Sequence, residues 1–249
     1  MDRLAERLYP GCRTGRPSPV DGTVAFYQRL LDRLPAEATV LDFGAGRGAA
    51  FAEQRPGVRE LVRLKPKLAR RIGVDINPAV LENAELDEAH VLTAENGYRI
   101  PLPDASVDAV LADWVLEHLH DPLRSLTECR RVLKSGGIFA ARTPNRWHYI
   151  YILSRAIGSR RLGRTLLRIS QPARRSEDIF ETHYRANTPG QLRGLLKDAG
   201  FTEVDILTHE AEPLYMMFSR VTLLLGWAYA SLAQRGLLPR AALLAFARL

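Results

Sequence analysis

An apolar run that leads directly into three alternate glycines constrains the fold of this chain more than any other feature. The stretch is "VLDFGAGRG", residues 40–48, in which Asp42 precedes Gly44, Gly46 and Gly48. One glycine is enough for a sharp turn, whereas three at alternate positions indicate a backbone that another group approaches closely. The residues "ATVLDF" before the glycines have the length and apolarity of a buried strand. We therefore predict a strand, a ligand-binding turn and a helix directly after it.

Predicted strands and helices alternate along the rest of the chain. The further strands are "RIGVDIN", "SVDAVLADW", "GIFAART" and "FTEVDIL", and the helices are 21–34, "PAVLENAELDEA", "DPLRSLTECRRVLKSGG" and "PGQLRGLLKDAG". Asp21 and Thr188 are expected to cap the first and the last of these helices. Strands that alternate with helices are typical of an α/β fold with a doubly wound, mostly parallel sheet and helices on both faces.

The formal net charge of +7 at pH 7 is unevenly distributed. Residues 154–176 contain seven arginines and no acidic residue, and only basic charged residues follow Glu212. A basic surface attracts phosphates, nucleic acid or anionic lipid headgroups, although a solvated helical face would have the same composition. Cys12 and Cys129 lack the spacing of zinc ligands, so neither a metal site nor a disulfide framework is expected. An N-terminus without an apolar signal segment also favours a cytoplasmic protein.

Spacing and charge at the glycine turn distinguish two kinds of nucleotide ligand. Ligands of open α/β sheets bind outside the carboxyl ends of the strands, where the turn and Asp75, at the end of "RIGVD", are both expected. A carboxylate there accepts hydrogen bonds from ribose hydroxyls, as in nicotinamide dinucleotides and adenosyl cofactors. The pattern is GxGxG rather than the GxGxxG of dinucleotide sites, and Asp42 would repel a pyrophosphate. The same carboxylate suits a cationic amino group such as that of methionine.

Four motifs in order resemble those of class I S-adenosylmethionine-dependent methyltransferases, in particular the type 11-like small-molecule enzymes. They are "VLDFGAGRG", "IGVDINP", "IPLPDASVDAVLADWVLEHLHDP" and "ECRRVLKSGGIFAARTPN". The resemblance covers about residues 36–208 and implies a Rossmann-like methyltransferase fold with S-adenosyl-L-methionine as the cofactor. Residues 1–35 would then be an N-terminal segment with one helix, and residues 209–249 an apolar helical tail.

The resemblance also implies which residues bind the cofactor. The glycine turn would wrap the methionyl part, and Asp75 would bind the ribose. An acidic or amide residue before the fourth strand usually meets the adenine, and Asn96, with Glu95 beside it, is favoured because either side chain accepts a hydrogen bond from the adenine amino group. Trp114 would line the cofactor or acceptor pocket, or else belong to the core. The full predicted set is Asp42, Gly44, Ala45, Gly46, Gly48, Asp75, Ile76, Glu95, Asn96, Asp113 and Trp114.

Candidates for a general base follow two of the predicted strands. Methyl transfer from a sulfonium is a direct displacement, so alignment of the acceptor is the main task of the protein. A base is needed only if the acceptor starts protonated. The candidates are Glu117 and His118 in "DWVLEHLHD", His148 and Tyr149 in "TPNRWHYIY", and His183 in "FETHYRANTP". Residues 145–187 would form a helical insertion over the carboxyl edge of the sheet as an acceptor pocket or lid, and packing in that insertion is the alternative role for the residues it contains.

The last part of the chain departs from the pattern of the family, whose members usually end in a short antiparallel strand. Residues 214–234 and "RGLLPRAALLAFARL" predict two apolar helices with basic edges. Such helices suit a membrane surface, a homodimer interface or packing on the domain. The first has nearly the length of a membrane span, which Arg220 disfavours.

Taken together, the sequence predicts an S-adenosylmethionine-dependent methyltransferase that acts on a small-molecule or lipid-linked acceptor, mainly by positioning it. The protein would be cytoplasmic, with peripheral attachment to the inner face of the membrane if the tail binds lipid. The alternatives are an RNA-binding or RNA-methylating protein, a nicotinamide-dependent reductase and a catalytically silent, cofactor-binding member of the fold. Nucleic acid is disfavoured because no NPPY-like motif is present.

Overall fold

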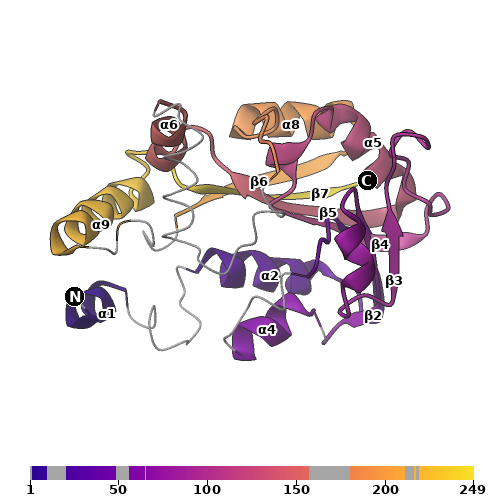
Figure 1. The fold of residues 1–249 in the computed structure, drawn as a ribbon, viewed down its shortest axis with the longest axis horizontal. Helices are drawn as coiled ribbons and strands as arrows, with labels where there is room; N and C mark the ends of the chain where they lie inside the picture. The colour runs from indigo at the N-terminus through magenta and orange to yellow at the C-terminus, as the bar shows by residue number, and fades with distance from the viewer. Residues whose placement is uncertain are drawn as a thin grey trace.

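The computed structural model describes residues 2–9, 21–48, 56–64, 66–156, 180–210, 216 and 219–249. A seven-stranded sheet runs through its centre in the order β3-β2-β1-β4-β5-β7-β6 (Figure 1). The strands are β1 (Ala38–Phe43), β2 (Leu68–Asp75), β3 (Glu88–Val91), β4 (Val107–Asp113), β5 (Leu133–Pro144), β6 (Glu203–His209) and β7 (Ala242–Arg248). Neighbouring strands are parallel, except that β7 is antiparallel to both β5 and β6. The predicted doubly wound, mostly parallel sheet is confirmed.

Helices cover both faces of the sheet. On one face lie α2 (Gly22–Arg33) and α4 (Pro56–Val62), and on the other lie α5 (Pro122–Val132) and α8 (Pro189–Asp198) (Figure 1). In β1, Val40 packs in the apolar cluster with α2 and α4, while Leu41 packs in the cluster with α5 and α8. A parallel strand buried on both faces requires a continuous apolar run, which accounts for the residues that precede the glycine turn.

Both predicted helix caps are present. The carboxylate of Asp21 accepts a hydrogen bond from the backbone N–H of Thr23 at 2.7 Å. The hydroxyl of Thr188 accepts one from the backbone N–H of Gln191 at 3.2 Å. These side chains satisfy N–H groups that have no partner within the helix, so α2 and α8 begin where the sequence indicates.

The strand order places a ligand site at the carboxyl ends of β1 and β4. From β1 the chain proceeds through β2 to β3 at one edge of the sheet, and β4 then returns to the other side of β1. Ligands of open α/β sheets bind where the order reverses in this way. The glycine turn follows β1 and Trp114 follows β4, so both lie at this point.

The predicted helix "PAVLENAELDEA" is wrong beyond its first turn. The structure has only a short 3-10 helix, η1 (Pro78–Glu82), and the edge strand β3 follows. Asn83 ends η1, because its side-chain amide donates to the carbonyl of Gly46 at 3.2 Å and its oxygen accepts from the N–H of Glu85 at 3.1 Å. An asparagine bonded to backbone in this way competes with continuation of a helix, and here it attaches the segment to the glycine turn.

The predicted second helix of the C-terminal tail is also wrong. Residues of α9 (Arg220–Gln234) are helical, but those of β7 form a strand between β5 and β6. Gly236, at φ 78°, ends the helix, and the first six residues of β7 are all buried. A strand buried on both faces shows no alternation of polar and apolar residues, so its pattern resembles that of an apolar helix. The chain therefore contains the antiparallel strand usual in the family, and the last part of the tail belongs to the sheet.

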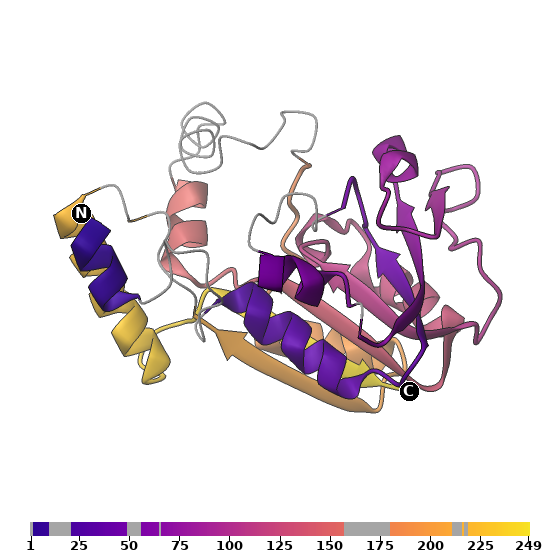
Figure 2. The same cartoon turned by 90° about the horizontal axis from the view of Figure 1, so that it is seen from below.

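The helices α1 (Asp2–Leu8) and α9 lie beyond one end of the sheet. Figures 1 and 2 show α1 beside α9 at one end of the molecule, where Leu223 packs with Ala5 and Tyr9. The helix α6 (Tyr149–Ala156) follows β5 and leads into the arginine-rich segment, most of which lies outside the described residues, as does Cys12. No helix in the described part of the chain combines the length and apolarity needed to cross a membrane.

Candidate functional site

A cavity of about 500 Å³ opens where the strand order reverses. Five segments form its walls: the glycine turn, the end of β2 with the residues that follow it, Leu92 after β3, the residues after β4, and the chain around residue 181. Among its lining residues are Gly44, Gly46, Asp75, Ile76, Leu92, Trp114, Val115, His118, Phe180, Glu181 and His183. The structure thus brings together residues predicted to bind a cofactor and two of the predicted catalytic residues.

The glycine turn needs glycine for two reasons. Gly44, Gly46 and Gly48 have φ values of 79°, 47° and 97°, in the left-handed region that side chains disfavour. In addition, a Cβ atom at Gly44 would overlap the side chain of Val115. Gly48 and Ala45 do not line the cavity, but the N–H of Gly48 donates to the carbonyl of Ala45 at 3.1 Å and so holds the shape of the turn.

Asp75 is fixed in a position suited to a nucleoside. Its Oδ2 accepts a hydrogen bond from the N–H of Gly46 at 2.8 Å, and its Oδ1 accepts one from the N–H of Asn77, also at 2.8 Å. Each oxygen keeps a second lone pair for another donor. The neighbouring Ile76 is 56% exposed and lines the same cavity. A carboxylate next to an exposed apolar side chain suits ribose hydroxyls and a flat base respectively.

Asp42 lies beneath the turn and does not line the cavity. It forms a buried ion pair with Arg71, whose Nη2 and Nε lie 2.6 Å and 3.1 Å from its Oδ2. Burial raises the pKa of the Asp42 carboxyl above its usual value, and Arg71 opposes that shift. In this structure Asp42 thus pairs with an arginine of β2, and its contact with a cationic amino group stays a prediction.

A second buried ion pair supports Trp114. Arg142 donates from Nε and Nη2 to the two oxygens of Asp113 at 2.6 Å and 2.7 Å, and the hydroxyl of Tyr27 donates to the same carboxylate at 3.0 Å. Burial, and next the charge of Asp113, raise the pKa of the Tyr27 hydroxyl. The carbonyl of Arg142 accepts from the N–H of Trp114 at 2.8 Å, and its guanidinium lies 5.2 Å from the Trp114 ring.

Trp114 itself has an unusual backbone conformation. Its φ is 59° and its side chain, 40% exposed, lines the cavity. A large residue in the left-handed region is strained, and such strain is concentrated at ligand sites. Asp113, by contrast, does not line the cavity. It pairs with Arg142, whose carbonyl and guanidinium in turn contact Trp114. The sequence predicted Asp113 and Trp114, but neither Arg142 nor Tyr27, because these partners lie on other elements.

His118 lines the cavity, and one nitrogen of its ring is held by a hydrogen bond. Its Nδ1 lies 2.7 Å from the carbonyl oxygen of Glu181. Because a carbonyl only accepts, Nδ1 carries the proton, and Nε2 of the neutral ring is left with a lone pair. The same Nε2 is 3.9 Å from Oε1 of Glu117, a buried carboxylate that also accepts from the hydroxyl of Thr143 at 3.0 Å. This arrangement can accept a proton at Nε2 and stabilise the resulting charge.

His183 also lines the cavity and is attached to the turn that carries His118. The carbonyl of Glu117, in the 3-10 helix η2 (Leu116–His118), accepts from the N–H of His183 at 2.7 Å. The ring of His183 packs edge-on against that of His120, with centroids 5.5 Å apart. The returning end of segment 145–187 is therefore attached to the turn after β4 and closes one side of the cavity.

The structure does not bring His148 and Tyr149 to this cavity. His148 is buried, with Nε2 3.3 Å from Oε1 of Glu210, and its ring centroid is 4.3 Å from that of Tyr149. Tyr149 packs in turn against Tyr229 of α9 at 4.4 Å. Burial, followed by the charge of Glu210, raises the pKa of Tyr149 to about 12, which makes this phenol hard to ionise. The two predicted catalytic residues join α6 to α9.

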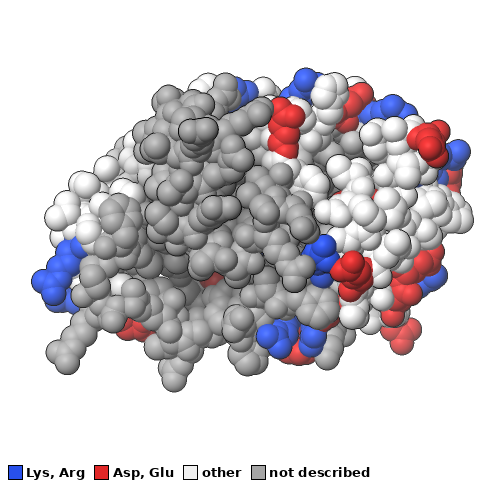
Figure 3. All heavy atoms as spheres, viewed as in Figure 1, with Lys and Arg blue, Asp and Glu red and all other residues white. Residues whose placement is uncertain are grey.

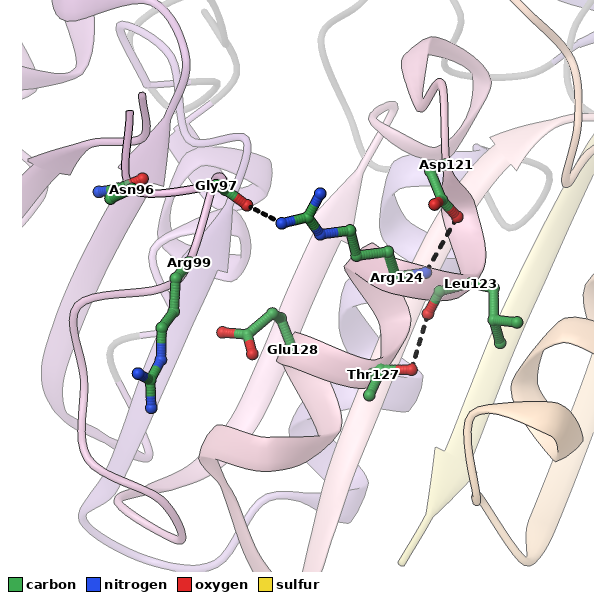
Figure 4. A pocket seen from close by; sticks show the side chains of 8 residues that line it. All are labelled: Asn96, Gly97, Arg99, Asp121, Leu123, Arg124, Thr127 and Glu128. Atoms are coloured by element: carbon green, nitrogen blue, oxygen red, sulfur yellow. Dashed lines mark hydrogen bonds between the residues drawn. The ribbon is translucent and has the colours of Figure 1, made fainter. Parts of the chain in front are cut away.

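Glu95 and Asn96 also lie away from the cavity. Asn96 lines a separate pocket of about 410 Å³, together with Arg99 and Arg124 (Figure 4). There Arg124 donates to the carbonyl of Gly97 at 2.8 Å. The cavity wall on this side is formed by Leu92, one residue after β3. Glu95 and Asn96 thus do not line this cavity, and their contact with adenine stays a prediction.

Comparison with known proteins supports the resemblance. Residues 41–141 match the model of a protein family described as a methyltransferase domain. A probable S-adenosylmethionine-dependent methyltransferase of Mycolicibacterium smegmatis is 32% identical over 183 residues, which are 73% of this chain and 58% of that protein. The chain spans little more than half the length of such relatives.

Solved structures share the fold at low sequence identity. A SAM dependent methyltransferase from Archaeoglobus fulgidus aligns with a TM-score of 0.57 and 19% identity, covering 100% of this chain and 99% of that one. The [4+2]-cyclase SpnF aligns with a TM-score of 0.55 and 19% identity, covering 94% of this chain and 84% of that one. The family match and the relatives therefore identify a methyltransferase domain of the class I S-adenosylmethionine-dependent family, and the solved structures share its fold.

Proposed function

We propose that this protein transfers a methyl group from S-adenosyl-L-methionine to a small-molecule or lipid-linked acceptor, and that His118 removes a proton from the acceptor. The observation that carries the proposal is the fixed ring of His118 on the wall of the same cavity as Asp75 and Trp114. The residues expected to bind the cofactor and a candidate base thus line one cavity.

The residues of the cavity fit the cofactor. When bound, it supplies a methyl group on a sulfonium, which leaves as a neutral thioether. Gly44 and Gly46 line the cavity without side chains, so the methionyl part would lie against their backbone. Asp75 would accept from ribose hydroxyls, and Ile76 would contact the base. Trp114 would lie near the sulfonium, where an aromatic face favours a cation.

Proton removal follows from the tautomer of His118. Nε2 takes the proton of a hydroxyl, a phenol or an ammonium as the acceptor atom attacks, and the nearby carboxylate of Glu117 stabilises the imidazolium that forms. His183 and Phe180 line the same side of the cavity and would contact the body of the acceptor. The proposal therefore specifies an acceptor that starts protonated.

Two other functions remain as alternatives that can be tested. The fold of the [4+2]-cyclase SpnF is similar, so a member of the fold that binds the cofactor without methyl transfer is one alternative. An RNA-binding or RNA-methylating protein is the other, based on the seven arginines of residues 154–176. Binding to RNA would fall steeply with salt concentration, because phosphate contacts release counterions.

The first test is calorimetric titration of S-adenosyl-L-methionine into the full chain. We expect binding in the micromolar range, at least tenfold weaker binding by Asp75→Asn, and no change in the control Glu203→Gln, whose side chain is 77% exposed on β6. A folded wild type that does not bind the cofactor would overturn the proposal.

The second test addresses the base. With an acceptor found by screening amphiphilic and phosphorylated compounds, His118→Gln should bind the cofactor normally but lose roughly 10²–10⁴-fold in kcat. The acidic limb of the pH–rate profile should disappear in the same variant. Turnover within about threefold of wild type would rule out His118 as the base while leaving methyl transfer intact.

A further inference from the structure

Helix α9 exposes a continuous apolar face. Val221, Leu224, Leu225 and Leu232 are 68%, 46%, 59% and 39% exposed, and Ala228 between them is also exposed. These five residues, here called the α9 stripe, follow the spacing i, i+3, i+4, i+7 and i+11, so they share one side of the helix. On a surface helix this side normally carries polar and charged residues. A contiguous apolar patch of this kind marks a surface that another protein or a membrane covers.

The inner side of α9 is already packed. Leu223, Gly226, Ala230 and Ala233 are buried, and Leu223 contacts α1. Ser219 caps the helix, accepting from the N–H of Thr222 at 3.1 Å. The opposite side of α9 is therefore packed and its first turn is capped, and the stripe is the side that faces outward.

The two charged residues at the ends of α9 are both positive. Arg220 and Arg235 stand at the two ends of α9, both are exposed, and neither forms an ion pair with any described residue. Arg220 lies in the first turn, where a cation opposes the helix dipole, so it does not serve helix stability. No acidic residue occurs between residues 213 and 249. In Figure 3 the described surface at the position of α9 is uncharged, with a basic group at its edge.

Helix α6, which packs against α9, is followed along the chain by an arginine-rich segment. Tyr149, in the first turn of α6, packs against Tyr229 of α9, and α6 leads into residues 154–176 with their seven arginines and no acid. An apolar stripe with an arginine at each end of its helix is complementary to a surface whose interior is apolar and whose outer layer is anionic. A bilayer of anionic phospholipids has both properties.

We propose that the α9 stripe docks on an anionic phospholipid bilayer, with the helix lying in the plane of the membrane. At 15 residues, α9 is about 22 Å long, which is too short to span a bilayer core of about 30 Å. The stripe enters the acyl region, while Arg220 and Arg235 reach lipid phosphates at its two ends. Trp227, 42% exposed beside the stripe, belongs at the interface. The docking itself does not depend on the proposed function. Only its role, which is to bring the enzyme to a lipid-linked acceptor, rests on that function.

Vesicle co-sedimentation of the full chain tests the proposal. Vesicles of phosphatidylcholine with phosphatidylglycerol are compared with vesicles of phosphatidylcholine alone, for wild type and for the double variant Leu224→Gln/Leu225→Gln. Leu81→Gln is the matched control, because Leu81 is 63% exposed on η1, outside α9. Cofactor binding is measured on every variant by calorimetry, so that failure of the docking surface is distinguished from failure of the proposed function.

We expect wild type and Leu81→Gln to bind the anionic vesicles, and the double variant to bind them at least tenfold more weakly with unchanged cofactor affinity. Neutralising Arg220→Gln/Arg235→Gln should weaken binding and reduce its dependence on salt. The proposal is overturned if wild type does not bind anionic vesicles, or if the double variant binds as well as wild type. It is also overturned if wild type is a dimer that the double variant converts to a monomer and neither binds vesicles, since a second copy of the chain would then cover the stripe.

Discussion

Replacing Arg71 by methionine would leave Asp42 beneath the glycine turn with no cation beside it. The two side chains are 5% and 10% exposed, and Nη2 of Arg71 lies 2.6 Å from Oδ2 of Asp42. Removing one partner of a buried ion pair costs about 3–5 kcal/mol of unfolding free energy, because the remaining charge stays desolvated. For a domain of this size the loss corresponds to a fall in melting temperature of roughly 6–20 °C.

The loss should depend on pH in a defined direction. Burial raises the pKa of Asp42 and Arg71 lowers it, so removal of Arg71 raises the folded-state pKa further. A carboxyl whose folded-state pKa exceeds its unfolded value binds more protons when folded. Its contribution to stability is therefore present below the unfolded pKa and is lost as pH rises through the folded pKa. Arg71→Met should be closer to wild type in mildly acidic than in mildly alkaline buffer.

Urea unfolding followed by circular dichroism measures both effects. The double variant Asp42→Asn/Arg71→Met removes the stranded charge and should recover more than half of the lost stability. Lys134→Met is the control, since Lys134 pairs with Asp108 at 2.8 Å while 45% exposed, and such a pair contributes at most about 1 kcal/mol. The reasoning is refuted if Arg71→Met lies within about 1 kcal/mol of wild type, or if the double variant is no more stable than the single one.

Three further predictions concern single residues. Gly44→Ala should abolish cofactor binding in a calorimetric titration, because its Cβ would overlap Val115 in a left-handed backbone, and retained affinity would show that the turn can adjust. Gly194→Ala, in α8 with nothing within 4 Å of the added Cβ, should raise the unfolding free energy by about 0.5–1 kcal/mol and leave that binding unchanged; a loss of stability in urea would contradict this. In a Cys12→Ser background, Cys129, whose burial raises the pKa of its thiol, should react with a thiol reagent only as fast as the protein unfolds, and rapid reaction in native buffer would show that the site is open.

The sequence predicts the parts of the site that depend on neighbouring residues. The glycine turn follows from a buried strand and from φ values that only glycine adopts freely, and Asp75 follows from its place at the end of an apolar run. The partners of Asp42 and Asp113 could not be predicted in this way. Arg71 and Arg142 lie on the adjacent strands β2 and β5, and only the strand order brings each opposite its carboxylate.

Burial on two faces explains why β7 was predicted as a helix. The residues of β7 are apolar throughout because the strand lies between β5 and β6 with helices on both sides, and nothing in that composition separates a strand from a helix. His148 and Tyr149 have the residue types of a catalytic pair, yet their surroundings are Glu210 and Tyr229 from distant parts of the chain. Residue type alone does not distinguish a polar cluster in the core from an acceptor site.

The position of β7 also affects how the protein is made. It is the last of the seven strands along the chain, but it lies between two strands that are synthesised earlier. Until β7 emerges from the ribosome, β5 keeps an unpaired edge, and β6 lacks the one strand with which it pairs in the finished sheet. Open edges of this kind pair readily with other chains. A nascent or truncated chain that lacks these few residues would therefore depend on chaperones to avoid aggregation, even though strands β1 to β4 beside the cavity are complete.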